Sequence, residues 1–474
     1  MNPLLKAPAV LALAVALVGC AGGAGRGATP ASDADALHSA AEQLTSVIVY
    51  DIFSPPQASR VYAYASIAAY EVLRQGDTAY RSLAGQVRGL APVPAPPSAE
   101  PVSLPLAGVH AFMTVGRALT FSQSRMDTLR NELDARFRQA GVTGAEYDRS
   151  IEYGERVAQH ILQWSNQDNY RASRSMPKFS VTREAGRWIP TPPAYMDAVE
   201  PNWGSLRPFV LDSASQFQLP APVPFDSTKG SAFYRQTQEV YDTGRGLTEE
   251  QRLIAAFWDC NPYVMHVQGH TMFATKKITP GGHWMGIARI AARKSGADIT
   301  RAAEIYARLG IALSDGFLSA WAEKYRTNVV RPETVVNRWL DPKWEPLLQT
   351  PPFPEYPSAH SVISTAASAV LSAEYGEQFA FVDSTEIEFG LPSREFKSFA
   401  AAAKEAAISR LYGGIHFRGA IEQGEVQGRQ VGALVLQRIH TRGRTTVAGA
   451  NRSGRGSVGS ANPAAEASVS PGGF

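Results

Sequence analysis

The chain has 474 residues, a formal net charge of +3 and only two cysteines. Its Lys and Arg residues are scattered rather than gathered into a stripe, so the composition does not favour a nucleic-acid-binding protein. A chain of this length can bury a sufficient core without disulfide bonds, and Cys260 is interpreted as a buried small hydrophobe rather than a nucleophile.

The amino-terminal segment has the pattern of an export signal. A lysine at position 6 precedes the apolar run Ala9–Val18, which is too short for a permanent membrane span. The sequence Leu17-Val18-Gly19-Cys20 predicts a lipoprotein signal over residues 1–19, with lipid on the thiol of Cys20. An ordinary secretory signal, cut at the small residues that follow, is the alternative. Both interpretations predict an exported protein with a soluble body, and in the first the lipid anchors it to a membrane of the bacterial envelope.

The body of the chain is predicted to be all-α, built as helical bundles with long proline-rich connections. Small polar residues at 20–33 predict a flexible tether, after which apolar residues recur at helical spacing. Strand patterns are few, and 383–389 is the best candidate. The predicted helices are 36–51, 56–74, 106–119, 122–140, 144–165, 231–241, 248–258, 282–294, 299–327, 358–375, 393–411 and 421–440.

The order of these helices predicts two helical regions. Residues 34–230 form the first, and its segment 175–228, rich in proline and aromatic residues, is expected to be an ordered wrap that helps to shape a substrate mouth. Residues 231–440 form the second and carry the candidate site. The Gly-, Ser- and Ala-rich residues 441–474 are expected to be a disordered tail.

One candidate anion site lies where Pro357-Ser358-Ala359-His360 opens the apolar helix 358–375. Ser358 is a favourable N-cap, and the first turn of a helix has backbone N–H groups without internal partners. Such an end attracts anions, and the Ala359 amide and the Ser358 hydroxyl would both act as neutral donors.

Two basic clusters would supply the charge for this site. Lys324 and Arg331 are seven residues apart, about 20° from eclipsed on a helix, so both are expected to face the same way. Arg410 and His416 flank a helix break at Gly413-Gly414. An isolated Lys-Arg pair would more often be a solvated helix face, but the three clusters together favour a site for a tetrahedral oxyanion.

These segments resemble the signature of the vanadium-dependent haloperoxidases and their relatives, the type 2 phosphatidic acid phosphatases and bacterial class A acid phosphatases. The signature is a lysine separated by six residues from Arg-Pro, then Pro-Ser-Gly-His, then Ser-Arg followed after five residues by histidine. This chain has Lys324 with Arg331-Pro332, Pro357–His360, and Ser409-Arg410 with His416. The resemblance covers roughly residues 188–438 and also implies a helical-bundle fold.

The resemblance implies a role for each matching residue. His416 would bind the vanadium of vanadate, and His360 would be the general acid or base. Hydrogen peroxide and halide would be the substrates, hypohalous acid the product, and Lys324 would polarise the bound peroxide. The groups that would hold the oxygens of vanadate are Lys324, Arg331, Ser358, Ala359 and Arg410.

Two aromatic residues favour the oxidative branch of this superfamily. Trp321 and Phe353 match positions that line the halide side of the vanadate site in chloroperoxidases, although simple packing between helices would also explain them. An exported acid phosphatase remains the alternative; phosphate esters would then be the substrates, and His416 would form a phosphohistidine. A non-catalytic oxyanion-binding lipoprotein is a third interpretation.

The sequence departs from the family pattern at two positions. Ala359 replaces glycine but keeps the backbone donor. Ala420 replaces an aspartate that usually binds the far nitrogen of the last histidine, and Glu422 or a backbone carbonyl is the expected substitute. His283, outside the signature, is interpreted as a core or surface residue.

Overall fold

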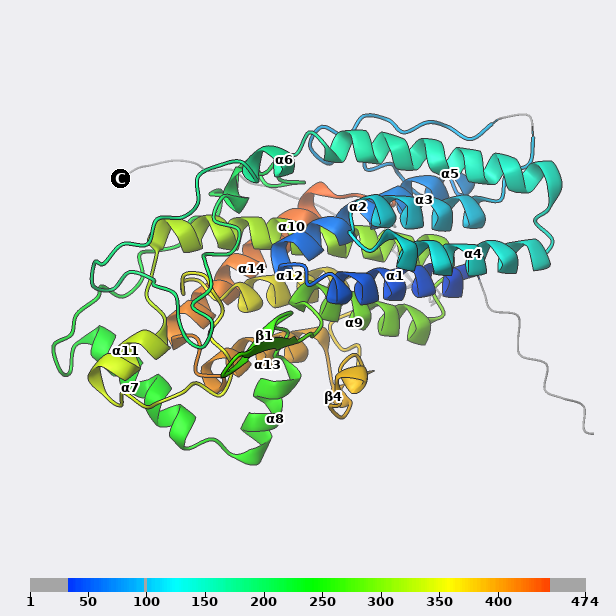
Figure 1. Cartoon of the computed structure of the whole chain (residues 1–474). Helices are drawn as coiled ribbons and strands as arrows, with labels where there is room; N and C mark the ends of the chain where they lie inside the picture. The colour runs from blue at the N-terminus through cyan, green and yellow to red at the C-terminus, as the bar shows by residue number, and fades with distance from the viewer. Residues whose placement is uncertain (1–32, 98–99, 444–474) are drawn as a thin grey trace, which may run out of the picture.

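The computed structural model describes residues 33–97 and 100–443, and their regular structure is almost entirely helical, as predicted (Figure 1). Four short strands form two antiparallel hairpins, β1 (Val264–Gln268) with β2 (Thr271–Thr275) and β3 (Phe381–Asp383) with β4 (Arg394–Phe396). The α-helices of the described residues are α1 (Asp33–Tyr50), α2 (Pro55–Leu73), α3 (Leu104–Ala118), α4 (Gln123–Gln139), α5 (Gly144–Ser165), α6 (Tyr170–Ser173), α7 (Ala232–Arg245), α8 (Glu249–Phe257), α9 (Pro280–Ser295), α10 (Ile299–Thr327), α11 (Pro332–Trp339), α12 (Ala359–Tyr375), α13 (Phe399–Tyr412) and α14 (Arg418–Arg438).

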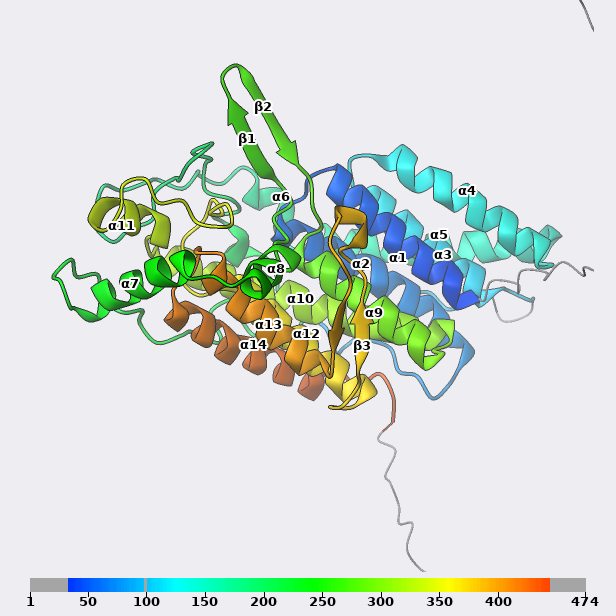
Figure 2. The same ribbon diagram turned by 90° about the horizontal axis from the view of Figure 1, so that it is seen from below.

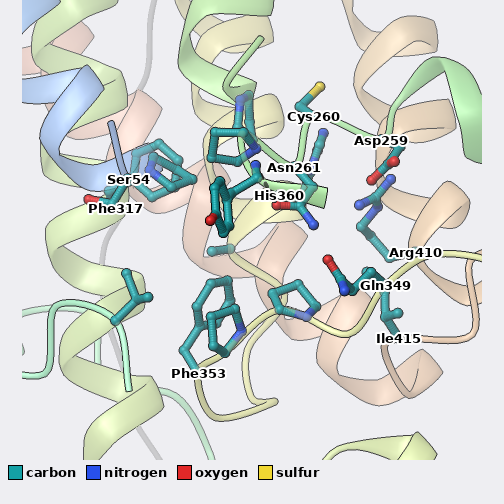
Figure 3. Close-up of a pocket in the computed structure, with 18 of the residues that line it drawn as sticks. Ser54, Asp259, Cys260, Asn261, Phe317, Gln349, Phe353, His360, Arg410 and Ile415 are labelled. Atoms are coloured by element: carbon teal, nitrogen blue, oxygen red, sulfur yellow. Dashed lines mark hydrogen bonds between the residues drawn. The ribbon is translucent and has the colours of Figure 1, made fainter. Parts of the chain in front are cut away.

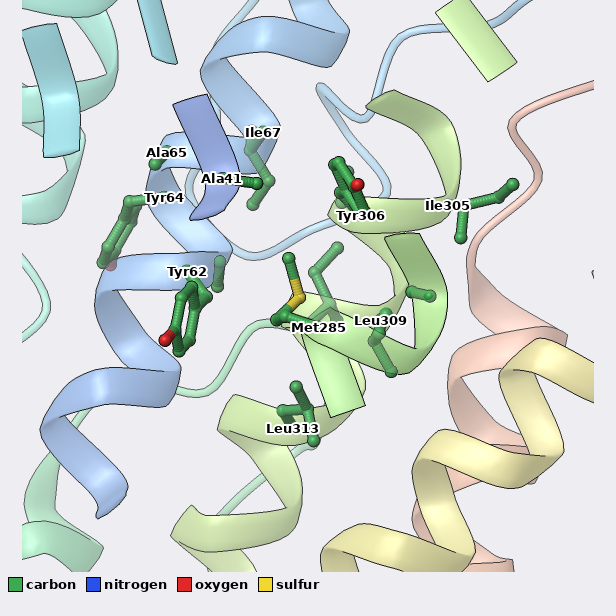
Figure 4. Packing of buried hydrophobic residues seen from close by; sticks show 14 of the residues in the cluster. Ala41, Tyr62, Tyr64, Ala65, Ile67, Met285, Ile305, Tyr306, Leu309 and Leu313 are labelled. Atoms are coloured by element: carbon green, nitrogen blue, oxygen red, sulfur yellow. The ribbon is translucent and has the colours of Figure 1, made fainter. Parts of the chain in front are cut away.

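Helix α10 is the structural centre of the molecule. It is 29 residues long and packs against both α2 and α12. A Cβ atom at Gly310 would lie 2.8 Å from Cα of Ala63, so glycine allows α10 and α2 to approach closely. Figure 4 shows buried side chains from both helices in the main core, among them Tyr62 and Ile67 of α2 and Leu309 and Leu313 of α10. That core contains residues from both predicted regions, and the boundary expected near residue 230 stays a prediction.

Three glycines of α14 bring this helix against α12, whose first residues form the candidate anion site. A Cβ atom at Gly424 would lie 2.6 Å from the carbonyl oxygen of Ser358, and one at Gly428 would lie 2.3 Å from that of Val362. Gly432 makes a similarly close approach to Ala369. Because they recur every four residues, these glycines form one face of α14 and hold the start of α12 in place.

Most helix predictions are confirmed, and those for α5 and α10 have the observed bounds. The prediction of a strand at 383–389 is wrong, since β3 ends at Asp383 and Ile387–Phe389 is a 3-10 helix. The helix predicted from residue 393 also begins too early. Its first residues pair with β3 as strand β4, and α13 starts only after its N-cap, Ser398.

The β1–β2 hairpin and helix α11 are among the elements that were not predicted from the sequence. The β1–β2 hairpin projects from the helical body (Figure 2), and Met272 and Phe273 near its turn are exposed. Helix α11 begins at Pro332, directly after Arg331.

The irregular segment 175–228 is ordered, as expected. It contains no α-helix, but Trp188 and Trp203 within it are fully buried. Residues 441–443, predicted to belong to a disordered tail, are ordered, because Arg442 forms an ion pair with Glu304 and the Thr441 carbonyl accepts a hydrogen bond from Arg81 N–H.

The predictions for the signal segment, almost all of the tether and most of the tail concern residues that the structure does not describe. Cys20, almost all of the tether and the rest of the tail lie outside the described residues. No helix of the described residues is long and apolar enough to cross a bilayer.

Candidate active site

Six of the predicted site residues line one cavity of about 380 Å³, whereas Lys324, Arg331 and Ser358 lie behind its wall. Ala359, His360, Arg410 and His416 line it, together with both aromatic residues predicted for the halide side. Figure 3 shows His360 near the middle of this cavity, with Arg410 and Phe353 on different sides. The irregular segment contributes Met196 and Val199, so it does help to shape the cavity.

The first turn of α12 is built as predicted. Ser358 is its N-cap, and the Ser358 hydroxyl oxygen accepts from the Ser361 backbone N–H at 3.3 Å and from the Ser361 hydroxyl at 2.8 Å. Ala359 and His360 occupy the first two helical positions, where backbone N–H groups have no carbonyl partner within the helix.

Lys324 lies beneath this turn and is fully buried. Its ammonium group donates to the carbonyl oxygens of Pro354, Glu355 and Pro357 at 3.0, 3.0 and 2.6 Å. An ammonium group has three hydrogens, so all of them have acceptors in this structure. Burial, and then the charge of Arg331, lower the pKa of Lys324 well below its usual value. Lys324 therefore fixes the backbone that precedes Ser358.

Arg331 does not share a helix face with Lys324, contrary to prediction. Helix α10 ends at Thr327, and Asn328 has a left-handed conformation with φ of 48°. The chain then turns, and Arg331 is the N-cap residue of α11. The two cations still meet, because Arg331 Nε donates to the Phe353 carbonyl at 2.8 Å, on the same segment that Lys324 binds.

His416 lies between α13 and α14 and contacts Arg331 directly. Arg331 Nη1 is 3.1 Å from His416 Nε2 and donates to the Ile415 carbonyl at 2.9 Å. Burial, followed by the charges of Arg331, Lys324 and Arg410, lowers the pKa of His416 well below its usual value. The imidazole is therefore neutral at neutral pH, and its Nε2 lone pair accepts from Arg331 Nη1, so a ligand at Nε2 would take the place of this contact.

The missing aspartate is replaced by Glu355, which was not among the substitutes expected from the sequence. Glu355 Oε1 accepts from His416 Nδ1 at 2.8 Å and from the Phe417 N–H at 3.0 Å. The expected substitutes do not fill this role: Glu422 is exposed, and a carboxylate rather than a carbonyl binds Nδ1. The only signal in the sequence was an acidic residue in an otherwise apolar, proline-rich stretch before Ser358.

Glu355 itself is buried in a mixed electrostatic environment. Burial raises the pKa of its carboxyl group to about 7, although the nearby charges of Arg331 and Lys324 act in the opposite direction. Its ionised form matches the donors around it, since it accepts both an imidazole and a backbone N–H.

Arg410 and His360 complete the polar part of the cavity. Arg410 donates to the Trp258 carbonyl from Nη2 at 2.5 Å and to the Ser409 hydroxyl from Nε at 3.0 Å. Burial, then the charges of Arg410 and His283, lower the pKa of His360 well below its usual value. His360 is therefore a neutral imidazole that faces the cavity.

Two buried polar atoms in this region have no hydrogen-bond partner, His360 Nε2 and Arg331 Nη2. Unpaired buried donors and acceptors are costly, and such atoms are retained where a ligand completes them. The donors, the neutral His416 and the helix start therefore fit a tetrahedral oxyanion such as vanadate or phosphate.

The two aromatic residues predicted for the halide side lie together. The ring centroids of Trp321 and Phe353 are 4.8 Å apart, and Trp321 Nε1 donates to the Val199 carbonyl at 3.2 Å. Phe353 also faces the cations, with Lys324 Nζ at 5.1 Å from its ring centroid.

Sequence reasoning missed a further wall of the cavity. The segment Asp259–Tyr263, between α8 and β1, lines it, as does Gln349. No periodic or motif signal marks these residues, and only the folded chain brings them to the same cavity as Phe353.

The fold and the site together are those of a helical bundle with a pocket suited to a tetrahedral oxyanion beside a histidine. Residues 304–443 match the family model described as "VCPO second helical-bundle domain". A solved structure of a bacterial vanadium-dependent iodoperoxidase is 47% identical to this chain and superposes with a TM-score of 0.82. The match covers 87% of this chain and 98% of the iodoperoxidase. The chain therefore belongs to the vanadium-dependent haloperoxidases, which oxidise halide ions with hydrogen peroxide.

More distant relatives share the fold. A holo-form bacterial vanadium-dependent chloroperoxidase is 18% identical with a TM-score of 0.62, and 82% of this chain covers 93% of it. The apo form of such an enzyme is 17% identical with a TM-score of 0.60, and 80% of this chain covers 92% of it. No curated protein matches the chain.

Proposed function

We propose that this haloperoxidase binds vanadate at His416 and oxidises iodide. The overall reaction is iodide plus hydrogen peroxide plus a proton, giving hypoiodous acid and water. The support for iodide is the iodoperoxidase with 47% identity, because the more distant chloroperoxidases establish only a shared fold.

One observation carries the assignment of the site. His416 is held neutral, Glu355 binds its Nδ1, and Arg331 contacts its Nε2, while a second nitrogen of that guanidinium has no partner. A histidine fixed at one nitrogen by a carboxylate can use the other as a ligand once Arg331 Nη1 releases it, and the unpaired Arg331 Nη2 is a ready donor for an oxyanion oxygen.

The residues of the site then have distinct tasks. Bound vanadate supplies the Lewis acid that activates hydrogen peroxide. Arg331 and Arg410 balance the oxyanion charge, and the start of α12 adds backbone donors. His360, neutral and with Nε2 unpaired, accepts the proton that hydrogen peroxide gives up and returns it to the leaving oxygen as water forms.

Lys324 has a more structural task than the resemblance implied. All three of its hydrogens bind the carbonyls of residues 354–357, so it reaches peroxide only if it releases one of them. We assign to it the positioning of Glu355 and Ser358, and through them of the imidazole and the helix start.

The apolar side of the cavity favours a weakly hydrated halide. Phe317, Trp321 and Phe353 line it, and the indole N–H of Trp321 is occupied by the Val199 carbonyl. Such walls offer few donors to replace the hydration shell of an anion. Iodide loses least on entering, because it is the most weakly hydrated of the common halides.

The test uses the purified chain with and without orthovanadate. We expect vanadate-dependent formation of triiodide from iodide and peroxide, and its loss in His416→Ala but not in His440→Ala, a change at an exposed histidine. Hydrolysis of an aryl phosphate by the vanadate-free protein, without any iodide oxidation in the reconstituted one, would instead support the phosphatase interpretation. Full iodide oxidation by His416→Ala would refute the assignment of that histidine.

We also propose that the chain is exported and tethered through lipidated Cys20. The support is the sequence Leu17-Val18-Gly19-Cys20 after a short apolar run. Cys20→Ser should move the protein out of the membrane fraction or block its processing. Recovery of the wild-type chain in the soluble fraction with a free amino terminus would rule out the lipid anchor.

A further inference from the structure

A second cluster of buried ionisable side chains lies next to the active-site cavity and has no role in the proposed reaction. His283 belongs to α9, Cys260 follows α8, and Asp383 and Glu386 lie at and just after the end of β3. Their exposed fractions are 0%, 3%, 0% and 1%, respectively. If Cys260 were only a small hydrophobic residue, its burial would be explained, but the ionisable side chains around it would not.

The cluster has the geometry of a metal site. His283 Nδ1 is 3.4 Å from Cys260 Sγ and 3.1 Å from Glu386 Oε1, and the three atoms lie within 4.8 Å of one another. Ligands about 2.0–2.3 Å from a tetrahedral zinc ion are roughly 3.3–3.6 Å apart. The observed separations from His283 need adjustments of only a few tenths of an ångström.

The carboxylate of Glu386 shows that the cluster is incomplete as it stands. Its Oε1 is buried and has no hydrogen-bond partner, because the approach of His283 Nδ1 does not have hydrogen-bond geometry. An unpaired carboxylate oxygen in the interior is costly, and a cation between it, the thiol and the imidazole would satisfy all three.

The other side of His283 is arranged as in known metal sites. Asp383 Oδ2 is 2.8 Å from His283 Nε2, while Asp383 Oδ1 accepts from the Thr385 N–H and hydroxyl at 3.0 and 2.7 Å. A carboxylate on one imidazole nitrogen orients the ring and leaves the other nitrogen for the metal. The Trp258 ring, stacked at 4.5 Å between centroids, fixes the plane of His283.

We propose that Cys260, His283 and Glu386 bind a zinc-like divalent cation, with Asp383 as the orienting carboxylate. One thiolate, one imidazole and one carboxylate are a ligand set that zinc accepts. The ion ties together the end of α8, helix α9 and the turn after β3. Cys260 also lines the cavity, and Trp258 lies between His283 and His360. The bound ion would therefore stabilise the wall of the active site.

The test measures metal rather than turnover. The purified chain is stripped with a chelator, dialysed with a small excess of zinc or cobalt, and analysed for metal per chain. We expect one equivalent in the wild type, with cobalt giving the near-ultraviolet charge-transfer absorption of a thiolate ligand. Glu386→Gln should weaken binding by more than the roughly 10–100-fold typical of an outer partner.

Matched variants keep this test interpretable. Glu388→Gln changes an exposed carboxylate of the same turn and should bind metal as the wild type does. Cys260→Ser should abolish the thiolate band, and if it fails to fold, Glu386→Gln still decides the matter. His416→Ala should retain the metal, which separates this site from the vanadate site. Wild-type protein without a bound equivalent, a cobalt spectrum without the thiolate band, or equal affinity in Glu386→Gln and Glu388→Gln would each overturn the proposal.

Discussion

Glu355→Gln is the most informative single change at the vanadate site. Glutamine has nearly the same shape, and its amide oxygen can still accept from His416 Nδ1, which is 2.8 Å from Glu355 Oε1 in the wild type. The substitution therefore removes a charge rather than a hydrogen bond. His416 becomes a poorer electron donor, as expected when the carboxylate behind a metal-binding imidazole is lost.

Two effects of this substitution oppose each other. A weaker donor at His416 lowers the affinity for vanadate by about 10–100-fold, or roughly 1.4–2.7 kcal/mol. Loss of a negative charge near Arg331 and Lys324 makes the site more attractive to any anion. Phosphate, which binds there without a bond to the imidazole, feels only the second effect. We therefore expect Glu355→Gln to weaken vanadate binding and to leave phosphate binding equal or tighter.

The pH dependence gives a second signature of the same carboxyl group. Burial raises the pKa of Glu355 to about 7, so its ionised form is present above that pH and is lost as the pH falls through it. The affinity of the wild type for vanadate should fall towards that of Glu355→Gln over the same range. The titration of vanadate itself affects both proteins equally. It therefore cancels in the ratio of their two vanadate affinities, measured at each pH.

The assay is an equilibrium titration of each protein with orthovanadate and with phosphate. Glu422→Gln is the control, since it removes an exposed carboxylate close in sequence to Ala420. Vanadate affinity unchanged in Glu355→Gln, or equal losses for vanadate and phosphate, would refute the role of Glu355 as the partner of His416.

Two further substitutions test how the site is built. Ala420→Asp restores the residue typical of the family, but Ala420 is buried and borders the same small cavity as Glu355. We expect the new carboxylate to destabilise the fold and raise the pKa of Glu355, so that vanadate binds no more tightly; tighter binding in a titration would show that the introduced carboxylate reaches His416 instead. Lys324→Met removes the donors to three backbone carbonyls and should lower the free energy of unfolding by on the order of 3 kcal/mol or more. Denaturant unfolding without vanadate measures this loss, and a result equal to that of Lys343→Met, a change at an exposed lysine, would contradict the structural role.

The sequence by itself predicted the helical class and part of the polar side of the cavity. Helices such as α5 and α10 follow from apolar spacing, because burial of one face repeats at the period of the helix itself. Ser358 and Gly413-Gly414 mark the end points of two helices through capping, which is also local. These short-range rules placed Ser358 at a helix start, where the structure has it.

Tertiary structure decided how the site residues are connected. Glu355 and His416 are 61 positions apart, and any carboxylate brought near Nδ1 would have served. The turn at Asn328 ends the helix of Lys324 before Arg331. The two cations were expected to be close because they share a helix face, but they are close because both bind the segment that precedes Ser358. The cluster of Cys260, His283 and Glu386 joins three segments that have no shared motif. Such contacts depend on how distant segments pack, and the local spacing of residues does not contain that information.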